Sequence, residues 1–304
     1  MNNVLLTGGR GFLNTILIEA LEEESNMHVV TVGRSNADIQ VDIRDVFTIP
    51  TSENFDMVIH AAGKAHSNPI TTKEENEFHL VNFEGTKNLC RALEGLGVIP
   101  KKFIFISTVA VYGVTEGIDI KEEHPLNGVS AYAYSKILAE TWLQDWAYKH
   151  NVTLGILRLP LIVGPNPPGN LQKMISGIKS GRYLSIGDAN ARKSMVFGED
   201  IAKIIPLLAK KGGTYNLTDG YHPTFRELEM VIAASLERKK PIKVPFWFAN
   251  GLARIGDITG NRFPIDSDKL KKITSVLTFD DSKARKELGW SPSNVLEKLA
   301  EILK

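Results

Sequence analysis

Cysteine is almost absent from the 304-residue sequence, and the single residue, Cys90, cannot form a disulfide within the chain. Long hydrophobic runs are absent too, since apolar stretches such as residues 204–209 fall far short of the ~20 residues that cross a bilayer. The first three residues lead directly into a short apolar segment, so no signal peptide is predicted. We therefore expect a soluble, cytoplasmic protein with no membrane partner.

A large excess of either charge is also missing. With 36 basic and 35 acidic residues the formal net charge is +1, which gives no argument for a nucleic-acid partner but leaves room for a local anion site. No spacing among the seven histidines and Cys90 indicates a metal site. The length suits one large α/β domain or two closely joined ones. Cys90 lies in a helical pattern, where packing is its expected role.

A short apolar run at residues 4–7 is followed by a glycine-containing turn and then by a helical pattern. This order is typical of the start of a Rossmann fold, in which the backbone approaches a pyrophosphate at the helix N-terminus. Gly8 and Gly11 fit the usual glycine spacing. Asn14 replaces the third glycine, so looser packing of the helix on the strand is expected.

The end of the second strand, residues 29–32, indicates which dinucleotide is bound. NAD-specific proteins usually carry an acidic residue there to hold the ribose hydroxyls, whereas this chain has Gly33, Arg34 and Ser35. Arg34, together with Arg10, can pair with a 2′-phosphate. The pattern therefore favours NADP(H), with NAD(H) as the other possibility. The alternative is that both arginines are solvated turn residues.

Strand-like and helical segments continue to alternate, which predicts a parallel sheet. A third strand ends before Asp42 and Ile43, a fourth ends at Ala61 and Ala62, and a fifth covers residues 103–106. Small side chains at the end of the fourth strand leave room for a cofactor at the carboxyl edge of the sheet. His60, within that strand, is expected to be a packed residue. The predicted fold class is α/β, with a doubly wound Rossmann sheet.

Residues 130–143 carry the pattern around which the chemistry is organised. Tyr132 and Lys136 are four residues apart in a helical segment, so a phenol and an ammonium group share one face of the helix. A nearby cation favours the phenolate, which makes the pair a candidate acid/base. Tyr134 faces elsewhere. The spacing alone does not distinguish such a pair from an ordinary surface pair.

Five motifs then follow one another along the chain: Gly8-x-x-Gly11-Phe12-Leu13, His60-Ala61-Ala62, Ser107-Thr108-x-x-Val111-Tyr112-Gly113, Tyr132-x-x-x-Lys136 and Arg158-x-Pro160-x-x-x-Gly164-Pro165. Together they resemble the extended short-chain dehydrogenase/reductase family, specifically its nucleotide-sugar epimerases, dehydratases and ketoreductases. The resemblance covers essentially the whole chain. It implies an NAD(P)-dependent enzyme with a nucleotide-sugar substrate.

The resemblance also implies roles for individual residues. Thr108 takes the position of the catalytic Ser/Thr, with Ser107 in a supporting position next to the substrate. Tyr132 is the implied acid/base, and Lys136 holds the nicotinamide ribose and biases the phenol toward ionisation. Asn82 matches a helix asparagine of the family, for which a structural hydrogen bond and a direct catalytic role are both open. The cofactor-binding residues implied in this way are Gly8, Arg10, Gly11, Phe12, Leu13, Arg34, Asp42, Ile43, Ala61, Ala62, Tyr132 and Lys136.

A segment rich in proline and glycine after residue 165 indicates an exit from the sheet into a loop. By the resemblance, residues 1–165, completed by about 195–218, form the dinucleotide-binding domain. Residues of about 166–194 and 219–304 form a smaller C-terminal α/β substrate-binding lobe. Asn170, Leu171, Arg192 and Lys193 are the implied substrate-binding residues of this lobe, and Lys193 occupies the usual arginine position. A solvated pair of cations is the alternative for Arg192 and Lys193.

Two further features are predicted in the C-terminal half. Thr224 with Glu227, and Asn294 with Glu297, have the spacing of helix N-caps. The segment of residues 244–249 is aromatic and apolar; core packing is its favoured role, and a pocket or a partner surface is the alternative.

Three enzymatic functions are weighed, together with one function of another class. A 4,6-dehydratase is disfavoured because that subgroup carries Asp-Glu after the catalytic threonine, where this chain has Val109 and Ala110. The favoured function is NADP(H)-dependent 4-ketoreduction of a UDP-linked 6-deoxy-4-keto-N-acetylhexosamine. An NAD-dependent UDP-sugar 4-epimerase is the alternative, and a non-catalytic NADP(H)-binding sensor or assembly protein is the alternative of another class. A homodimer is expected from the resemblance.

Overall fold

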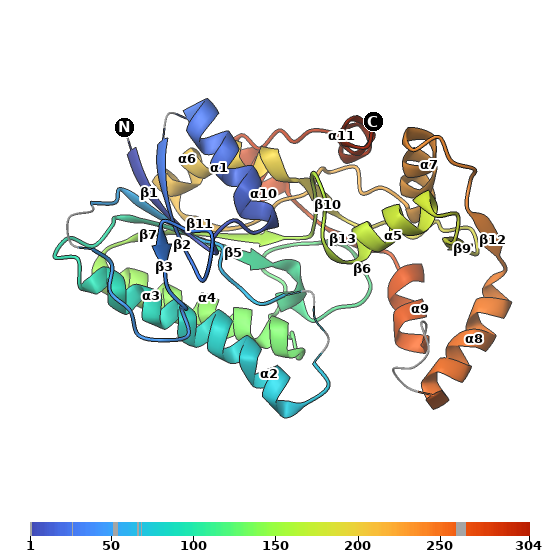
Figure 1. Cartoon of the computed structure of the whole chain (residues 1–304), viewed down its shortest axis with the longest axis horizontal. Coiled ribbons are helices and arrows are strands. Elements are labelled where there is room, and N and C mark those ends of the chain that lie inside the picture. The colour runs from blue at the N-terminus through green and yellow to red at the C-terminus, as the bar shows by residue number, and fades with distance from the viewer. Residues whose placement is uncertain (1, 26, 51–53, 66, 68, 260–265) are drawn as a thin grey trace.

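A seven-stranded parallel sheet forms the centre of the protein (Figure 1). The computed structural model describes residues 2–25, 27–50, 54–65, 67, 69–259 and 266–304. The sheet has the order β11-β7-β5-β4-β1-β2-β3. Its strands are β1 (Asn2–Thr7), β2 (Met27–Gly33), β3 (Ile39–Gln40), β4 (Met57–His60), β5 (Lys102–Thr108), β7 (Thr153–Leu159) and β11 (Gly213–Asn216). The predicted Rossmann sheet is confirmed. Because the strand order reverses between β1 and β4, the ligand crevice is expected at their carboxyl ends.

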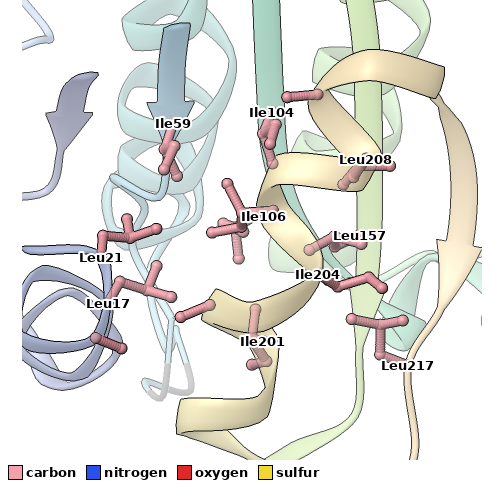
Figure 2. Packing of buried hydrophobic residues seen from close by; sticks show 14 of the residues in the cluster. Leu17, Leu21, Ile59, Ile104, Ile106, Leu157, Ile201, Ile204, Leu208 and Leu217 are labelled. Carbon is pink, nitrogen blue, oxygen red and sulfur yellow. The ribbon is translucent and has the colours of Figure 1, made fainter. Parts of the chain in front are cut away.

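Helices cover both faces of this sheet, as continuous apolar strands require. On one face lie α1 (Phe12–Ser25), α6 (Gly198–Lys211) and α10 (Ser282–Leu288). Figure 2 shows this layer, in which Leu17 and Leu21 of α1 and Ile204 and Leu208 of α6 meet strand residues such as Ile106. The opposite face carries α3 (Gly85–Glu94) and α4 (Ala131–His150), preceded by α2 (Thr72–His79) and the π-helical turn η1 (Leu80–Glu84).

A second, smaller core lies beyond the carboxyl edge of the sheet. It is built from α5 (Gly169–Lys179), α7 (Phe225–Ser235) and α11 (Val295–Ile302). Three two-stranded parallel pairs accompany it: β8 (Leu161–Val163) with β10 (Met195–Phe197), β9 (Leu184–Ile186) with β12 (Ile242–Val244), and β6 (Gly117–Ile120) with β13 (Leu277–Phe279). The remaining elements are the 3₁₀ turn η2 (Val109–Tyr112), α8 (Phe246–Thr259) and α9 (Ser267–Thr274).

The structure differs from the predicted domain boundaries at α10. Ala284 and Leu288 of this helix, with Trp290 after it, belong to the core between α1, α6 and the sheet. This segment therefore packs on the sheet, although the prediction assigned all of residues 219–304 to the lobe. The predicted caps are present: Thr224 Oγ1 accepts from the backbone N–H of Glu227, and Asn294 caps α11.

The aromatic segment at the start of α8 is the second difference. Core packing was the favoured role for residues 244–249, but Phe246, Trp247 and Phe248 are exposed. Among the described residues of α8, small ones such as Ala249, Ala253 and Gly256 are buried. No helix within the described part of the chain is long and apolar enough to cross a membrane.

Candidate active site

The glycine turn after β1 brings backbone close to the end of β4. Gly8 has φ +112°, and a Cβ at this position would lie 3.1 Å from the backbone nitrogen of Ala62. Gly9 is also in the left-handed region, with φ +56°. Only glycine fits such a turn without strain. The turn thus leaves open the space that a dinucleotide needs next to α1, and its residues fit that group.

Asn14 does not loosen the packing of α1, contrary to the expectation from the sequence. Its side chain is buried, and Nδ2 donates to the carbonyl oxygens of Thr7, at 3.0 Å, and of Gly9, at 2.9 Å. These bonds tie the end of β1 to the turn, and each such bond contributes about 1 kcal/mol. The glycine usually found here is thus replaced by an amide that clamps the turn.

The two arginines expected to select the cofactor are exposed. Neither Arg10 nor Arg34 forms an ion pair with a residue that the structure describes. The first carboxylate after β2 is Asp38, which accepts from the backbone and the hydroxyl of Thr31. These bonds hold the pKa of Asp38 below its usual range. Arg34 is therefore available to an anion, whereas the carboxylate of Asp38 is already engaged.

The loop after β3 is fixed by an interaction that the sequence did not reveal. Asn88 of α3 donates to the carbonyl oxygens of Ile43 and Arg44, both at 3.0 Å. Asp42 is paired with Arg44 at 2.7 Å, and this contact lowers the pKa of the carboxyl. Ile43 is buried against Gly85. The loop is therefore held rigidly at the edge of the expected cofactor crevice.

Thr108 and Tyr132 are brought together by two different elements. Thr108 is the last residue of β5 and caps the turn η2, where its Oγ1 accepts from the backbone N–H of Ala110 at 3.2 Å. Tyr132 lies in the first turn of α4, whose N-cap is Ser130. The side chain of Thr108 lies close enough to the phenol of Tyr132 to affect its pKa. Two hydroxyl groups that can share one substrate oxygen thus meet at the carboxyl edge of the sheet.

Lys136 lies one helical turn after Tyr132 and is almost completely buried. Its Nζ donates to the carbonyl oxygen of Ile106 at 2.8 Å and lies 4.4 Å from the ring centroid of Phe105. A Cβ at Gly63 would lie 3.4 Å from this Nζ, so the small residue leaves room for the ammonium group. Burial lowers the pKa of Lys136 to about 8.

The protonation state of the Tyr132 phenol depends mainly on its burial. Burial raises the pKa of the Tyr132 phenol, and the side chain of Thr108 only partly offsets this effect. The ammonium group of Lys136 donates to the carbonyl oxygen of Ile106. Tyr132 is accordingly in the protonated form at neutral pH, which is the form that a proton donor needs.

Asn82 connects three parts of the site. It is fully buried in η1, and its Nδ2 donates to Ser135 Oγ at 2.9 Å and to the carbonyl oxygen of Lys64 at 3.1 Å. Its Oδ1 accepts from the backbone N–H of Lys64 at 2.7 Å. All of these contacts hold the loop after β4 against the helix that bears Tyr132. Of the two roles left open for Asn82, the structural hydrogen bond is present.

A buried polar network lies next to the candidate site. Ser107 donates to the carboxylate of Glu140, which also forms an ion pair with Arg158 at 2.8 Å. Arg158 in turn donates to Tyr112 Oη at 3.2 Å, and Tyr112 Oη donates to Asn216 Oδ1 at 2.7 Å. The sequence motifs named Ser107, Tyr112 and Arg158, but nothing in their spacing indicated Glu140 as their common partner. The Ser107 hydroxyl is thus engaged inside the protein, although the resemblance implied a contact with substrate.

His60 is a packed residue, as predicted. It lies at the end of β4 between two hydroxyl groups, with Nδ1 2.6 Å from Thr7 Oγ1 and Nε2 2.8 Å from Thr86 Oγ1. Burial lowers its pKa to about 3, with a smaller contribution from the charge of Lys136. His60 is therefore neutral at physiological pH. Cys90 is buried as well, which raises the pKa of its thiol.

The implied substrate residues of the lobe fall into different environments. Asn170 is exposed in the first turn of α5. The side chain of Leu171, in contrast, is packed in the core of the lobe and presents no polar group to a ligand. Arg192 donates to the carbonyl oxygen of His222 at 2.9 Å and to that of Tyr221 at 3.3 Å.

Lys193 is the cation of this pair that remains available. It is half-buried and forms no ion pair with any described residue, and burial lowers its pKa to about 8. An anion bound next to Lys193 would relieve this burial cost. Among the described residues, no group of three or more His, Cys, Asp or Glu side chains is placed to hold a metal ion.

Comparisons with known proteins agree with this geometry. The model of a family described as "NAD dependent epimerase/dehydratase family" matches residues 4–218. An Escherichia coli O157:H7 protein, N-acetyl-alpha-D-glucosaminyl-diphospho-ditrans,octacis-undecaprenol 4-epimerase, is 28% identical over 298 residues, which cover 93% of this chain and 88% of the relative. The fold resembles that of a Thermotoga maritima UDP-glucose 4-epimerase solved with UDP-glucose (TM-score 0.77, 22% identity, 99% and 97% of the two chains). It resembles equally an RMD structure from Pseudomonas aeruginosa complexed with NADPH (TM-score 0.77, 20% identity, 100% and 98%).

Proposed function

Because the chain belongs to the NAD-dependent epimerase/dehydratase family, we propose that it is an NADP(H)-dependent reductase of a nucleotide-linked 4-ketosugar. The substrate class proposed is a UDP-linked 6-deoxy-4-keto-N-acetylhexosamine. The observation that carries the proposal is the placement of Thr108 at the end of β5 near Tyr132 in the first turn of α4, with Lys136 one helical turn further along α4.

The proposed roles follow from the protonation states. Tyr132, whose pKa is raised, donates a proton to the C4 oxygen of the sugar, and Thr108 donates a hydrogen bond to the same oxygen. Lys136 stabilises the phenolate that Tyr132 becomes. The bound nicotinamide would supply the hydride. Gly8 and Gly9 would hold the pyrophosphate part of the cofactor, in a turn that Asn14 fixes by its two hydrogen bonds.

Reduction is favoured over the other reactions of the family by two features. Val109 and Ala110 follow Thr108, so the turn η2 offers no acid or base for elimination of water. The exposed Arg34, without a carboxylate at the end of β2, fits a 2′-phosphate. A reductase needs an exchangeable reduced cofactor, which is usually NADPH, whereas an epimerase retains NAD.

A 4-epimerase is the second candidate for the same site. It is favoured by the names of the Escherichia coli and Thermotoga maritima proteins, both of which are 4-epimerases. The Escherichia coli name further points to a lipid-linked diphosphate sugar as a substrate of that protein. A non-catalytic sensor is disfavoured, because Tyr132 and Lys136 are both intact.

The test is a direct assay of the two reactions. Purified protein is mixed with NADPH and a panel of UDP-, GDP- and dTDP-linked 4-ketosugars, and the loss of absorbance of the reduced nicotinamide is followed. In parallel it is mixed with NAD⁺ and UDP-N-acetylhexosamines, and the products are separated. We expect stoichiometric NADPH oxidation with a UDP-linked ketosugar. Interconversion of C4 epimers without net cofactor consumption would instead establish the epimerase, and neither reaction would favour the sensor.

A further inference from the structure

An exposed apolar surface lies on the substrate lobe, away from the residues assigned to catalysis. We call it the lobe patch and define it as Leu184, Ile242, Phe246, Trp247, Phe248 and Ile255. Trp247 is 74% exposed and Ile242 70%, and the other four are between 47% and 53% exposed. Figure 1 shows their elements, β9, β12 and α8, at the end of the molecule opposite the amino-terminal strands. Isolated exposed apolar residues are ordinary, but a group of large ones indicates an interaction site.

Helix α8 differs from an ordinary surface helix in the side chains that it exposes to solvent. A surface helix buries its large apolar side chains and exposes polar ones. Here the small Ala249 and Ala253 are buried, while Trp247, Phe248 and Ile255 face outward. The large side chains therefore contribute little to the stability of the monomer, and their exposure needs another explanation.

The strands next to α8 extend the same surface. Leu184 of β9 and Ile242 of β12 are direct neighbours in the parallel pair, and both are exposed. The following pair, Ile186 and Val244, packs against the buried side of α8. Ile242 is four residues before the start of α8, which is at most about 13 Å of extended chain. The apolar side chains thus come from three adjoining elements.

Cations surround this surface. The segment that leads into β12 contains Arg238, Lys239 and Lys240, and Lys243 follows within the strand; all four are exposed. Lys179 and Arg182 precede Leu184 and are exposed as well. The acids close by in the sequence are Glu237, Asp188 and Asp257, the last of these within α8, and Asp188 pairs with Lys243 at 3.5 Å. The surroundings of the lobe patch are therefore strongly basic, although the chain as a whole has a net charge of only +1.

We propose that the lobe patch docks this enzyme on the surface of an anionic lipid membrane. Aromatic side chains such as Trp247 and Phe248 enter the headgroup region, and the surrounding lysines attract anionic lipids. A protein partner fits less well, because protein interfaces are depleted in lysine, whereas here lysine is the commonest neighbour of the apolar group. Such peripheral binding needs no membrane-spanning helix. It differs from the expectation from the sequence that the protein has no membrane partner.

The test is sedimentation of the full-length protein with vesicles. Vesicles of phosphatidylcholine alone are compared with vesicles that contain about 30% phosphatidylglycerol. We expect binding to the anionic vesicles only, and release at about 0.5 M NaCl, where surface charges are screened. The double variant Trp247→Ser/Phe248→Ser and the double variant Lys239→Glu/Lys240→Glu should each lower the bound fraction at least ~5-fold.

Matched controls separate docking from general damage. Leu207→Ser removes a 48% exposed apolar residue from α6, and Lys101→Glu reverses an exposed charge before β5; neither should change vesicle binding. Thermal unfolding and NADPH binding should be the same in all variants. Absence of binding to anionic vesicles, or equal loss in the controls, would overturn the proposal. An oligomer that only the Trp247→Ser/Phe248→Ser variant fails to form, without vesicle binding, would assign the lobe patch to a second copy of the chain and overturn it too.

Discussion

At the scale of single residues, the account depends on the phenol of Tyr132. Tyr132→Phe keeps the ring and its packing against Phe78, 6.2 Å away, but removes the proton donor. We expect kcat to fall by ~10²–10⁴-fold, the range typical of a general acid, while cofactor affinity stays nearly unchanged. Tyr134→Phe is the matched control, because Tyr134 is 55% exposed on another face of the same helix. Steady-state kinetics of both variants test this prediction. Equal losses of kcat in the two variants would rule out Tyr132 as the proton donor.

His60 gives a second prediction at this scale, concerning acid stability. Its pKa is lowered to about 3 in the folded protein, and an unfolded histidine titrates near 6.5. Between these values the unfolded state binds more protons, so the free energy of unfolding decreases as the pH falls below about 6.5. The contribution of this one residue amounts to about 2 kcal/mol between pH 7.5 and 5.

The measurement is urea unfolding at the two pH values for the wild type and for His60→Asn. The variant should be less stable at pH 7.5, because contacts with Thr7 and Thr86 change, but should lose about 2 kcal/mol less on acidification. An identical loss in both proteins would show that the histidine is not buried in its neutral form.

At the scale of elements, the turn after β2 should set the cofactor preference. NADP(H) is expected to bind at least ~10-fold tighter than NAD(H), the effect of one partly exposed charge-assisted contact at Arg34. Arg34→Asp should reverse this preference in calorimetric titrations, and Lys101→Asp should leave it unchanged. Gly33 is unsuitable for such a test, since a Cβ there would lie 2.8 Å from Gly9 Cα and disturb the turn. Equal affinities in the wild type would contradict the prediction.

A two-fold dimer is expected to form through the helices α3 and α4. Tyr134 and Tyr148 of α4 are exposed, and Phe83 and Trp142 are partly exposed on the same layer of helices. An isologous contact would bury such residues on both copies. Light scattering at micromolar concentration should therefore give twice the chain mass of 33.6 kDa, and Phe83→Glu should give the single mass. A wild-type monomer would exclude this interface.

A structural feature could be predicted from the sequence where it depends only on residues that are close together in the chain. The order of strands and helices, the caps at Thr224 and Asn294, and the packed His60 follow from patterns within a few residues, and the structure confirms them. Glu140 was not predicted, because its partners Ser107 and Arg158 are 33 and 18 residues away. The clamp formed by Asn14 depends likewise on where its amide points, which spacing alone does not give.

At the scale of the whole molecule, the exposed start of α8 shows a different reason why a structural feature could not be predicted from the sequence. An aromatic run such as residues 246–248 predicts burial from composition alone, yet whether it is buried depends on what the rest of the lobe leaves to cover it. The lobe core is already filled by α5, α7 and α11, and α8 attaches through alanines. Composition indicates that such a segment is apolar, while only the fold shows whether it faces a core, a ligand or a partner.

The measurement that tests the central claim most directly follows the hydrogen that arrives at C4 of the sugar. The full-length protein is given NADPH deuterated at the transferred position together with a UDP-linked 6-deoxy-4-keto-N-acetylhexosamine, and the product is analysed by mass spectrometry and NMR. The account predicts one deuterium at C4 of the product, with one NADPH oxidised per sugar reduced. No deuterium in the sugar, together with C4 epimerisation of UDP-N-acetylhexosamines in the presence of catalytic NAD⁺, would contradict the account and establish the epimerase instead.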